Sequence, residues 1–320
     1  EVLLHGYEQW GVDLLQRVRG MFTFVIWDKN KQELFGARDH FGIKPFYYAK
    51  MNGTFMYASE IKSLLRHPDF VKELNAEALK PYMTFQYPAI GETFFKGVYK
   101  LPEGHYFTYR DGKMDIHRYY DEDFREGKQK LGELVNSIDQ TVCDSVKAHQ
   151  IADVEVGSFL SSGVDSSYVA AVARPQHTYS IGFGKGTYNE SQQAGELAEL
   201  LKLNNTAESL TDEEAFAAFP RIQWHLDEPD SNPSCVPLYF LSALAAKDVK
   251  VVLSGEGADE LFAGYIDYGV HTKFKPIKVV TRWLTHLPAG ARKAIARFCK
   301  GKTFPGAWHL YANLAPAEES

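Results

Sequence analysis

One segment indicates most clearly the fold that we expect for this chain: Phe159-Leu160-Ser161-Ser162-Gly163-Val164-Asp165-Ser166-Ser167. It completes the apolar stretch 154–160, which we predict as a buried strand, and it runs into residues 166–173, which we predict as a helix. A strand, a turn and a helix in this order are the repeating unit of a parallel sheet with helices on both faces. Ligands bind such sheets beyond the carboxyl ends of the strands, so this segment predicts a ligand-binding turn.

The residue types in this turn suit an anion. Small side chains let backbone amides approach a phosphate, and the hydroxyls of Ser161, Ser166 and Ser167 add donors. The N-terminus of the following helix adds a partial positive charge. Asp165 is favourable beside a phosphate only if a divalent cation bridges the two groups. No Gly-Lys-Ser/Thr ends the segment, so it is not a P-loop of that type, and an ordinary turn capped by Ser and Asp is the alternative interpretation.

A second segment, Val251-Val-Leu-Ser-Gly-Glu-Gly-Ala-Asp-Glu-Leu-Phe-Ala-Gly-Tyr265, repeats the pattern. It also follows an apolar stretch with Ser-Gly, and it places Glu256, Asp259 and Glu260 where a helix is expected to begin. Three carboxylates this close repel one another unless a cation shares the site. Two such loops in one sheet, each with an Asp able to hold Mg²⁺, indicate a nucleoside triphosphate bound between them.

Strands and helices alternate around these loops, which predicts a doubly wound parallel sheet. The further expected strands are 178–183 and 249–253, and the expected helices are 131–146, 191–203, 212–224 and 237–246.

The region before about residue 120 has the pattern of a β-meander. Residues 20–27 form a nearly continuous apolar run, which we predict as a strand buried on both faces and returning after a turn at 28–31. Asn52-Gly53 and Asp111-Gly112 each predict a tight hairpin turn. We expect the neighbouring Arg38 and Asp39 to brace this layer as an ion pair. The charged stretch 121–130 lacks apolar periodicity and is the predicted linker between domains 1–120 and 131–320.

Composition narrows the class of protein. The 320 residues carry 35 Lys and Arg against 41 Asp and Glu, a net charge of −6, which argues against a nucleic-acid binder. No apolar run has the length of a membrane helix, so we expect no membrane partner. Cys143, Cys235 and Cys299 are odd in number and far apart, so a reducing cytoplasm is the expected compartment.

The two loop segments together resemble a known family. Residues 161–167 are similar to the SGGxDS pyrophosphate loop of glutamine-dependent asparagine synthetases, and residues 254–265 to their SGxGxDELFxGY segment. Asp227-Glu-Pro229 and the residues after it also resemble that family, and Arg19–Phe24, Ala37–Tyr48 and Ala58–Lys62 resemble the second half of its glutaminase domain.

This resemblance implies a fold and a reaction. The fold is α/β overall: a partial Ntn-type αββα glutaminase layer, then a doubly wound PP-loop ATP pyrophosphatase domain. The reaction is a two-step ligation in which ATP adenylates aspartate, releasing pyrophosphate, and ammonia, delivered from glutamine through an internal tunnel, displaces AMP. Aspartate, glutamine or ammonia, and ATP are the implied partners, Mg²⁺ is the implied metal, and a homodimer is possible.

The resemblance also implies roles for single residues. Glu256 matches the carboxylate that assists ammonia attack and the β-aspartyl-AMP step, while Asp165 and Asp259 would hold Mg²⁺. The implied ATP-binding residues are Leu160, Ser161, Ser162, Gly163, Val164, Asp165, Ser166, Ser167, Ile181, Ser254 and Gly255, with Leu160 and Ile181 beside the adenine and ribose.

The sequence departs from the family pattern at three places. Ser162 stands where many members have Gly, so it must either adopt a strained left-handed conformation or take ordinary backbone angles. The family's N-terminal cysteine nucleophile is absent, since the chain opens with Glu1, and its later ATP-site lysine would follow Ser320. Lys273 and Lys275 do not stand in the corresponding motif. We therefore expect a fragment that lacks both ends and has no glutaminase activity.

Two alternatives remain open from the sequence. One is a related adenylating ligase, such as a β-lactam synthetase or a peptide cyclase, which needs a different base arrangement from the one at Glu256. The other is a non-catalytic nucleotide-binding derivative, which would have no need of Asp165, Glu256 and Asp259 together.

Overall fold

The computed structural model describes residues 1–123, 127–183, 190–265, 284 and 286–299. The chain divides into two compact units. The first comprises residues 1–145, 180–191 and 207–249, and the second comprises 146–179, 192–206 and 250–320. The domain boundaries expected from the sequence stay a prediction.

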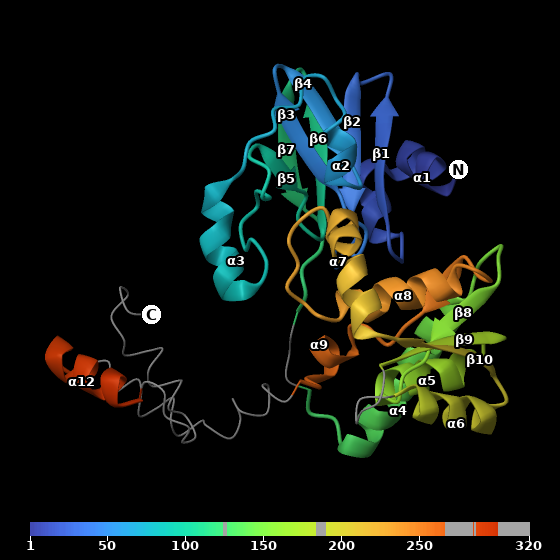
Figure 1. Ribbon diagram of the computed structural model, residues 1–320. Helices are drawn as coiled ribbons and strands as arrows, with labels where there is room; N and C mark the ends of the chain where they lie inside the picture. Colours follow the sequence, from blue (N-terminus) through green and yellow to red (C-terminus); the bar gives the residue numbers. More distant parts are fainter. Residues whose placement is uncertain (124–126, 184–189, 266–283, 285, 300–320) are drawn as a thin grey trace. The chain divides into compact units, whose positions relative to one another are not determined.

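Two antiparallel sheets form the β layers of the first unit (Figure 1). One sheet has the order β1-β2-β6-β7 and the other the order β4-β3-β5. The strands are β1 (Thr23–Asp28), β2 (Glu33–Arg38), β3 (Tyr47–Met51), β4 (Thr54–Ala58), β5 (Val98–Lys100), β6 (His105–Arg110) and β7 (Lys113–Arg118). The helices among them are α1 (Val2–Trp10), η1 (Gly11–Gln16), α2 (Ile61–Leu64), η2 (Ala76–Ala78) and α3 (Leu79–Phe85).

The two sheets face each other across an aromatic core. Phe107 of β6 lies 5.4 Å from Phe46, and Phe55 of β4 stacks on Tyr109 of β6 at 4.2 Å between ring centroids. On the outer face of the first sheet, Leu15 of η1 packs with Phe35. On the outer face of the second sheet, α2 buries its Ile61 and Leu64 in one cluster with Tyr47 and Val98. Helix, sheet, sheet and helix therefore follow one another, which confirms the expected αββα layering.

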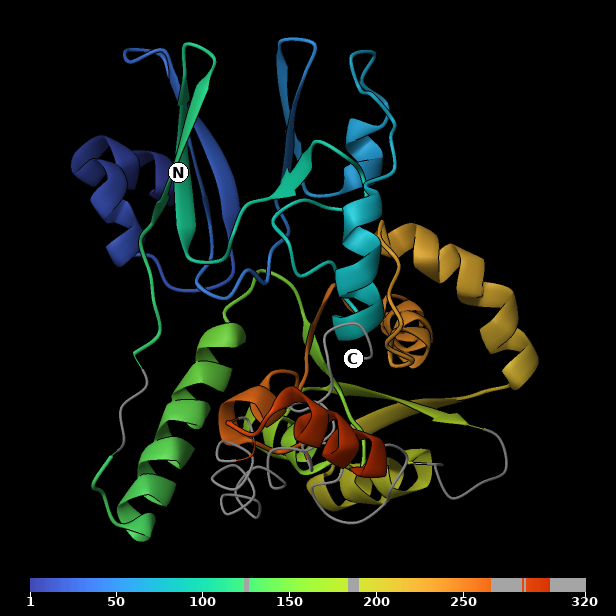
Figure 2. The ribbon, with the colours of Figure 1, turned by 90° about the vertical axis from the view of Figure 1, so that its left-hand side faces the viewer.

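The two predicted hairpin turns are confirmed. Asn52 and Gly53 have φ of 50° and 83°, and Asp111 and Gly112 have φ of 50° and 77°, so both central residues of each turn are left-handed. This is the backbone that matches the twist of the flanking strands. The turns lie at the same end of the layers (Figure 2), where Lys50 Nζ donates to the Gly112 carbonyl at 2.6 Å.

Residues 20–27 correct one expectation. β1 forms there, but it lies at the end of its sheet and pairs with β2 alone among the described strands. Ile26 is buried, whereas Met21 is 44% exposed and Trp27 is 48% exposed. The strand contacts a core cluster on each face, through Phe24 and Ile26 on one face and Val25 on the other. Because no further described strand pairs beyond its outer edge, it is only partly buried.

A four-stranded sheet with the order β10-β9-β8-β11 carries the rest of the fold. β8 pairs in parallel with both β9 and β11. The elements are α4 (Leu131–His149), β8 (Val156–Phe159), α5 (Val164–Ala173), β9 (His177–Phe183), α6 (Ser191–Leu201), β10 (Asn204–Leu210), α7 (Asp212–Leu226), α8 (Cys235–Ala245), β11 (Val251–Leu253), α9 (Ala258–Phe262) and α12 (Ala289–Cys299).

The parallel sheet confirms the expected fold class, and the expected helices and strands are found with small shifts of their ends. β10 was not predicted, because its sequence Asn204–Leu210 is mostly polar and only Leu210 is buried. It is an edge strand, where side chains on both faces reach solvent. No helix in the described ranges has the length and apolar character needed to cross a bilayer.

Candidate functional site

The loops after β8 and β11 leave the sheet at one edge. β8 is the strand between β9 and β11, and the register pairs Ser158 of β8 with Thr178 on one side and Leu253 on the other. The chain passes from β8 through α5 to β9, and later returns to the opposite side of β8 as β11. This is a topological switch point, where open parallel sheets bind ligands. The two segments singled out from the sequence therefore start side by side.

A glycine lets the two loops touch. An added β-carbon on Gly255 would lie 2.7 Å from the backbone nitrogen of Ser166 and 2.9 Å from the carbonyl carbon and the β-carbon of Asp165. Real β-carbons do not approach backbone atoms this closely, so a side chain at Gly255 would force the loops apart. The second loop thus lies directly against the first turn of α5.

Serine hydroxyls hold the first loop in shape. Ser166 Oγ accepts from the Ser161 backbone nitrogen at 3.1 Å and lies 2.7 Å from Ser161 Oγ, which in turn accepts from the Gly163 nitrogen at 3.1 Å. Ser167 Oγ donates to the Gly163 carbonyl at 2.6 Å. Gly163 is the N-cap of α5, and no side chain caps the helix there. The loop is pre-formed by its own hydroxyls while the start of α5 keeps no side-chain cap.

Ser162 takes ordinary backbone angles. It is absent from the described non-glycine residues with positive φ, and Gly163 beside it has φ of −69° and ψ of 150°. The serine therefore replaces the family's glycine without a left-handed conformation, and of the two outcomes expected for Ser162 the unstrained one is found.

The residues expected to bind ATP differ in how exposed they are. Ser162, Gly163 and Val164 are exposed, while Ser161, Asp165, Ser166 and Ser167 are half-buried. Leu160 is 3% exposed and belongs to a cluster with Ala170 of α5 and Ala194 and Ala198 of α6, two helices on one face of the sheet (Figure 1). Its side chain supports the loop from below, so a contact from Leu160 to a nucleotide would have to come from its main chain. Ile181 is half-buried on β9.

The second loop presents its carboxylates around a short helix. Ser254 and Glu256 are exposed, and the Glu256 nitrogen donates to Ser254 Oγ at 3.4 Å. Glu260 accepts a hydrogen bond of 2.7 Å from the Tyr265 hydroxyl. That bond, together with burial and the charges of Glu260, Asp259 and Glu256, raises the pKa of Tyr265 to about 12. Tyr265 therefore stays a neutral hydrogen-bond donor in a strongly negative loop, and the same bond lowers the pKa of Glu260.

The donor set fits a magnesium ion held largely by a substrate. Within the residues that the structure describes, no three His, Cys, Asp or Glu side chains are grouped as a metal site. Asp165 stands in the first turn of α5 and Asp259 in the first turn of α9, and both are half-buried. Mg²⁺ is commonly bound by one or two carboxylates, with phosphate oxygens and water completing its octahedron. Asp165 follows the serine-rich turn and Asp259 follows the loop that touches it at Gly255, so the two residues supply a donor set of this kind.

Arg38 and Asp39 correct another expectation. Arg38 donates to the carbonyls of Lys44 at 2.8 Å, Leu101 at 2.7 Å and Gly42 at 2.5 Å. Asp39 accepts from the backbone nitrogens of Phe22, Phe41, Ile43 and Lys44. Both side chains brace the loop 39–44, as expected, but they do so through backbone groups rather than as an ion pair with each other. Burial lowers the pKa of Arg38.

Other residues named from the sequence lie elsewhere. Lys273 and Lys275 fall outside the described residues. Cys235 is a free thiol. The sequence singled out the motif Asp227-Glu-Pro229 by its resemblance to the family, but it assigned no role to Asp227 or Glu228.

The fold and this site together define a class: an αββα layer of the amidotransferase type joined to an α/β unit with a serine-rich loop at its switch point. Comparison with known families agrees. A glutamine amidotransferase domain matches residues 1–120, and the asparagine synthase family matches residues 137–316, more than half of the chain. The chain belongs to the asparagine synthase family.

Named relatives show the same relationship. The chain is 39% identical to "Asparagine synthetase [glutamine-hydrolyzing] 1" of Bacillus subtilis (strain 168), over 92% of this chain and 46% of that protein. It is 38% identical to a provisionally assigned glutamine-hydrolysing asparagine synthetase of Mycobacterium bovis, over 95% of this chain and 48% of that protein. It is 30% identical to "Amidase chry2" of Gibberella zeae, over 83% of this chain and 43% of that protein. The chain spans about half the length of these relatives.

Proposed function

We propose that the protein carrying this chain makes asparagine from aspartate in an ATP-dependent reaction, with glutamine or ammonia as the nitrogen donor. The aspartate side-chain carboxylate is first joined to AMP with release of pyrophosphate, and ammonia then displaces AMP from the β-aspartyl-AMP intermediate. The observation that carries the proposal is the contact of Gly255 with Asp165 and Ser166, which brings the anion-type loop and the acidic loop together at the switch point. Membership of the asparagine synthase family supports the substrates.

The first loop would bind the pyrophosphate part of ATP. Residues 161–167 offer backbone amides, four serine hydroxyls and the uncapped start of α5, all of which favour phosphate oxygens. Ser254 and Gly255 would contact the nucleotide from the second loop, with Leu160 and Ile181 beside its adenine and ribose. Because Ser161 and Ser166 already bond to each other at 2.7 Å, little ordering of the loop is required when ATP binds.

Asp165 and Asp259 would hold Mg²⁺. The ion would supply charge that offsets the negative pyrophosphate as it departs. Asp165 is well placed for this because its backbone lies against Gly255, the residue that joins the two loops. Asp259 packs against Gly264, where an added β-carbon would lie 2.0 Å from its Oδ1, so its side-chain position depends on the glycine at that place.

Glu256 would act on the attacking amine. Addition of ammonia to an acyl carbon gives a cationic adduct that has to lose a proton, and a carboxylate is a suitable acceptor. Glu256 is exposed just before α9, whereas Glu260 is engaged by Tyr265. Of the two glutamates in this loop, Glu256 is therefore the one with its carboxylate open to a substrate.

The compartment and the assembly belong to the proposal as well. The wide separation of the three cysteines supports a reducing cytoplasm, and a homodimer stays a prediction from family resemblance alone.

The decisive experiment measures pyrophosphate release from ATP by the protein at its natural full length, with and without aspartate. We expect release that depends on aspartate, with asparagine formed when glutamine or ammonium chloride is added. Release that is driven by another carboxylate substrate, without asparagine, would favour a cyclising ligase of the related type. ATP binding with no pyrophosphate release under any of these conditions would favour a non-catalytic nucleotide-binding protein.

A further inference from the structure

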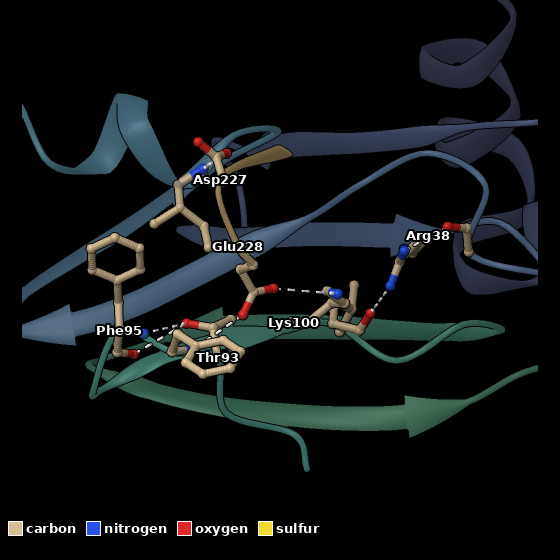
Figure 3. Close-up of polar contacts among 10 residues, drawn as sticks. Arg38, Thr93, Phe95, Lys100, Asp227 and Glu228 are labelled. Carbon is tan, nitrogen blue, oxygen red and sulfur yellow. Dashed lines mark hydrogen bonds and ion pairs between the residues drawn. The ribbon is translucent and has the colours of Figure 1, made fainter. Parts of the chain in front are cut away.

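Two adjacent carboxylates, Asp227 and Glu228, leave the end of α7 and contact the β layer formed by residues 1–120 (Figure 3). All of these contacts lie within the first compact unit. Asp227 has φ of 64° and ψ of −34°. A positive φ costs free energy in a residue other than glycine and persists where the surroundings enforce it. The chain thus turns sharply at this position in order to direct both side chains at the layer.

Asp227 caps a helix, α2, that begins 166 residues earlier in the sequence. Its Oδ2 accepts from the Ile61 nitrogen at 2.6 Å, and its Oδ1 accepts from the Lys62 nitrogen at 3.3 Å. These are the first two amides of α2, whose own N-cap, Glu60, makes no side-chain capping bond. Lys62 Nζ completes the arrangement at 2.9 Å from Asp227 Oδ1, and the Asp227 side chain is 6% exposed. The carboxylate is therefore buried with every strong interaction that such a group needs.

Glu228 holds the neighbouring loop. Its Oε1 accepts from the Phe94 nitrogen at 3.0 Å, its Oε2 lies 3.7 Å from Lys100 Nζ, and its side chain is 10% exposed. The loop is already shaped by Thr93, whose hydroxyl accepts from the Phe95 nitrogen at 3.1 Å. The Phe94 nitrogen between these two residues therefore has its acceptor in Glu228, outside the loop.

The charges of Asp227 and Glu228 affect the pKa of Tyr47, which lies inside the β layer. Burial, then the charges of Glu228 and Asp227, raises the pKa of Tyr47 to about 12. Tyr47 belongs to the same buried cluster as Ile61. The two carboxylates thus act on the core of the layer and not only on its surface.

The segment that follows is held just as firmly. Gln223 of α7 bonds twice to the backbone of Asp230, at 3.1 and 3.2 Å. Asp230 Oδ1 accepts from the Asn232 nitrogen, and Asn232 Oδ1 accepts from the Ser234 nitrogen, so the turn leads directly into α8. α8 ends at Ala245 and β11 begins at Val251, immediately before the acidic loop with Glu256. Asp227 and Glu228 therefore fasten the segment between α7 and α8 to the β layer, and α8 is the last helix in the chain before β11 and the acidic loop.

We propose that Asp227 and Glu228 are positioning residues that couple the β layer to asparagine formation when glutamine is the nitrogen donor. This inference rests on the proposed function. In that function the β layer belongs to the part that releases ammonia from glutamine, and the acidic loop belongs to the part that uses it. Ammonia supplied from solution does not need the two parts to be held together, whereas ammonia released from glutamine does.

The test is the double variant Asp227→Ala/Glu228→Ala in the protein at its natural full length. We expect asparagine formation from glutamine to fall roughly tenfold while formation from ammonium chloride stays within about twofold, because positioning and not chemistry is lost. The glutamate released per asparagine formed rises accordingly. Asp227→Asn should recover part of the loss, because an amide oxygen still accepts from the Ile61 nitrogen and Asn tolerates a positive φ.

The matched control is Glu208→Ala, which removes an exposed ion pair of 2.8 Å with Lys247 in the same unit. It should leave both activities and their ratio unchanged. Equal loss with both nitrogen donors in the double variant, or no loss with either, would overturn the coupling role.

Hydrogen exchange separates this role from the proposed function. In the 320-residue chain the double variant should speed exchange of the Ile61, Lys62 and Phe94 amides by about tenfold or more, since each loses its acceptor. Unchanged exchange would show that the contacts do not form. A wild-type protein that makes no asparagine from either donor would instead overturn the proposed function, and the coupling role with it, while faster exchange in the variant would still establish the contact itself.

Discussion

Gly255 lies against the backbone of Ser166, so closely that a β-carbon at Gly255 would be 2.7 Å from the Ser166 nitrogen. The two residues belong to loops that follow adjacent parallel strands, β8 and β11. Their contact fixes the separation of the serine-rich loop and the acidic loop, and it leaves no room for a side chain between them.

Gly255→Ala should separate the two loops. We expect the rate of aspartate-dependent pyrophosphate release to fall roughly 10–100-fold, because small displacements of positioned groups cost rates of that order. The measurement is the release assay on the protein at its natural full length. Gly195→Ala in α6 is the control, since an added β-carbon there meets nothing within 4 Å. If Gly255→Ala kept the wild-type rate, the contact would have no part in catalysis.

Asp165→Asn and Asp259→Asn should each abolish pyrophosphate release while leaving the fold intact. Asparagine keeps the shape of aspartate but loses the charge that binds a divalent cation. Far-UV circular dichroism checks the fold, and titration of the release rate with Mg²⁺ checks the metal. Asp111→Asn, in an exposed hairpin turn with φ of 50°, is the matched control. Release at the wild-type rate in either site variant would remove that residue from the metal assignment.

Glu256→Gln should impair the chemistry far more than the binding of ATP. Loss of a positioned base typically costs about 10²–10⁴-fold in rate, and glutamine is nearly isosteric with glutamate. Asparagine formation and nucleotide affinity are measured side by side, with Glu199→Gln on the exposed face of α6 as the control. A fall in asparagine formation of less than about threefold would reduce Glu256 to a residue of the turn before α9.

Gly36→Ala should destabilise the β layers. An added β-carbon on Gly36 of β2 would lie 2.3 Å from the ring of Phe107, which is fully buried between the sheets. Overpacking a tight core costs about 1–3 kcal/mol. Thermal or urea unfolding of the 320-residue chain measures the change, with Gly195→Ala again as the reference. An unchanged unfolding midpoint would mean that the Phe107 ring moves aside without penalty.

Sequence reasoning singled out the candidate site because its two segments carry local signals. Small residues and hydroxyls after an apolar stretch predict an anion-binding turn, and three carboxylates at the start of a helix predict a cation. The hairpin turns at Asn52-Gly53 and Asp111-Gly112 were found for the same reason, since left-handed backbone angles are encoded in the turn residues themselves. The strand β10 was not predicted, because its polar residues have the pattern of a loop.

Patterns within a few turns of chain were thus enough to predict the parallel-sheet fold class and to single out the residues of the two candidate loops. The αββα layering of the first part was predicted from family resemblance alone. Only the tertiary structure decided that Gly255 meets Ser166 and that Asp227 caps α2 from 166 residues beyond Ile61. It also decided that Arg38 and Asp39 hold backbone groups instead of each other. A buried polar group needs a hydrogen-bond partner in the protein, because it has no access to water. Which partner it finds depends on how segments that are distant in the sequence pack together.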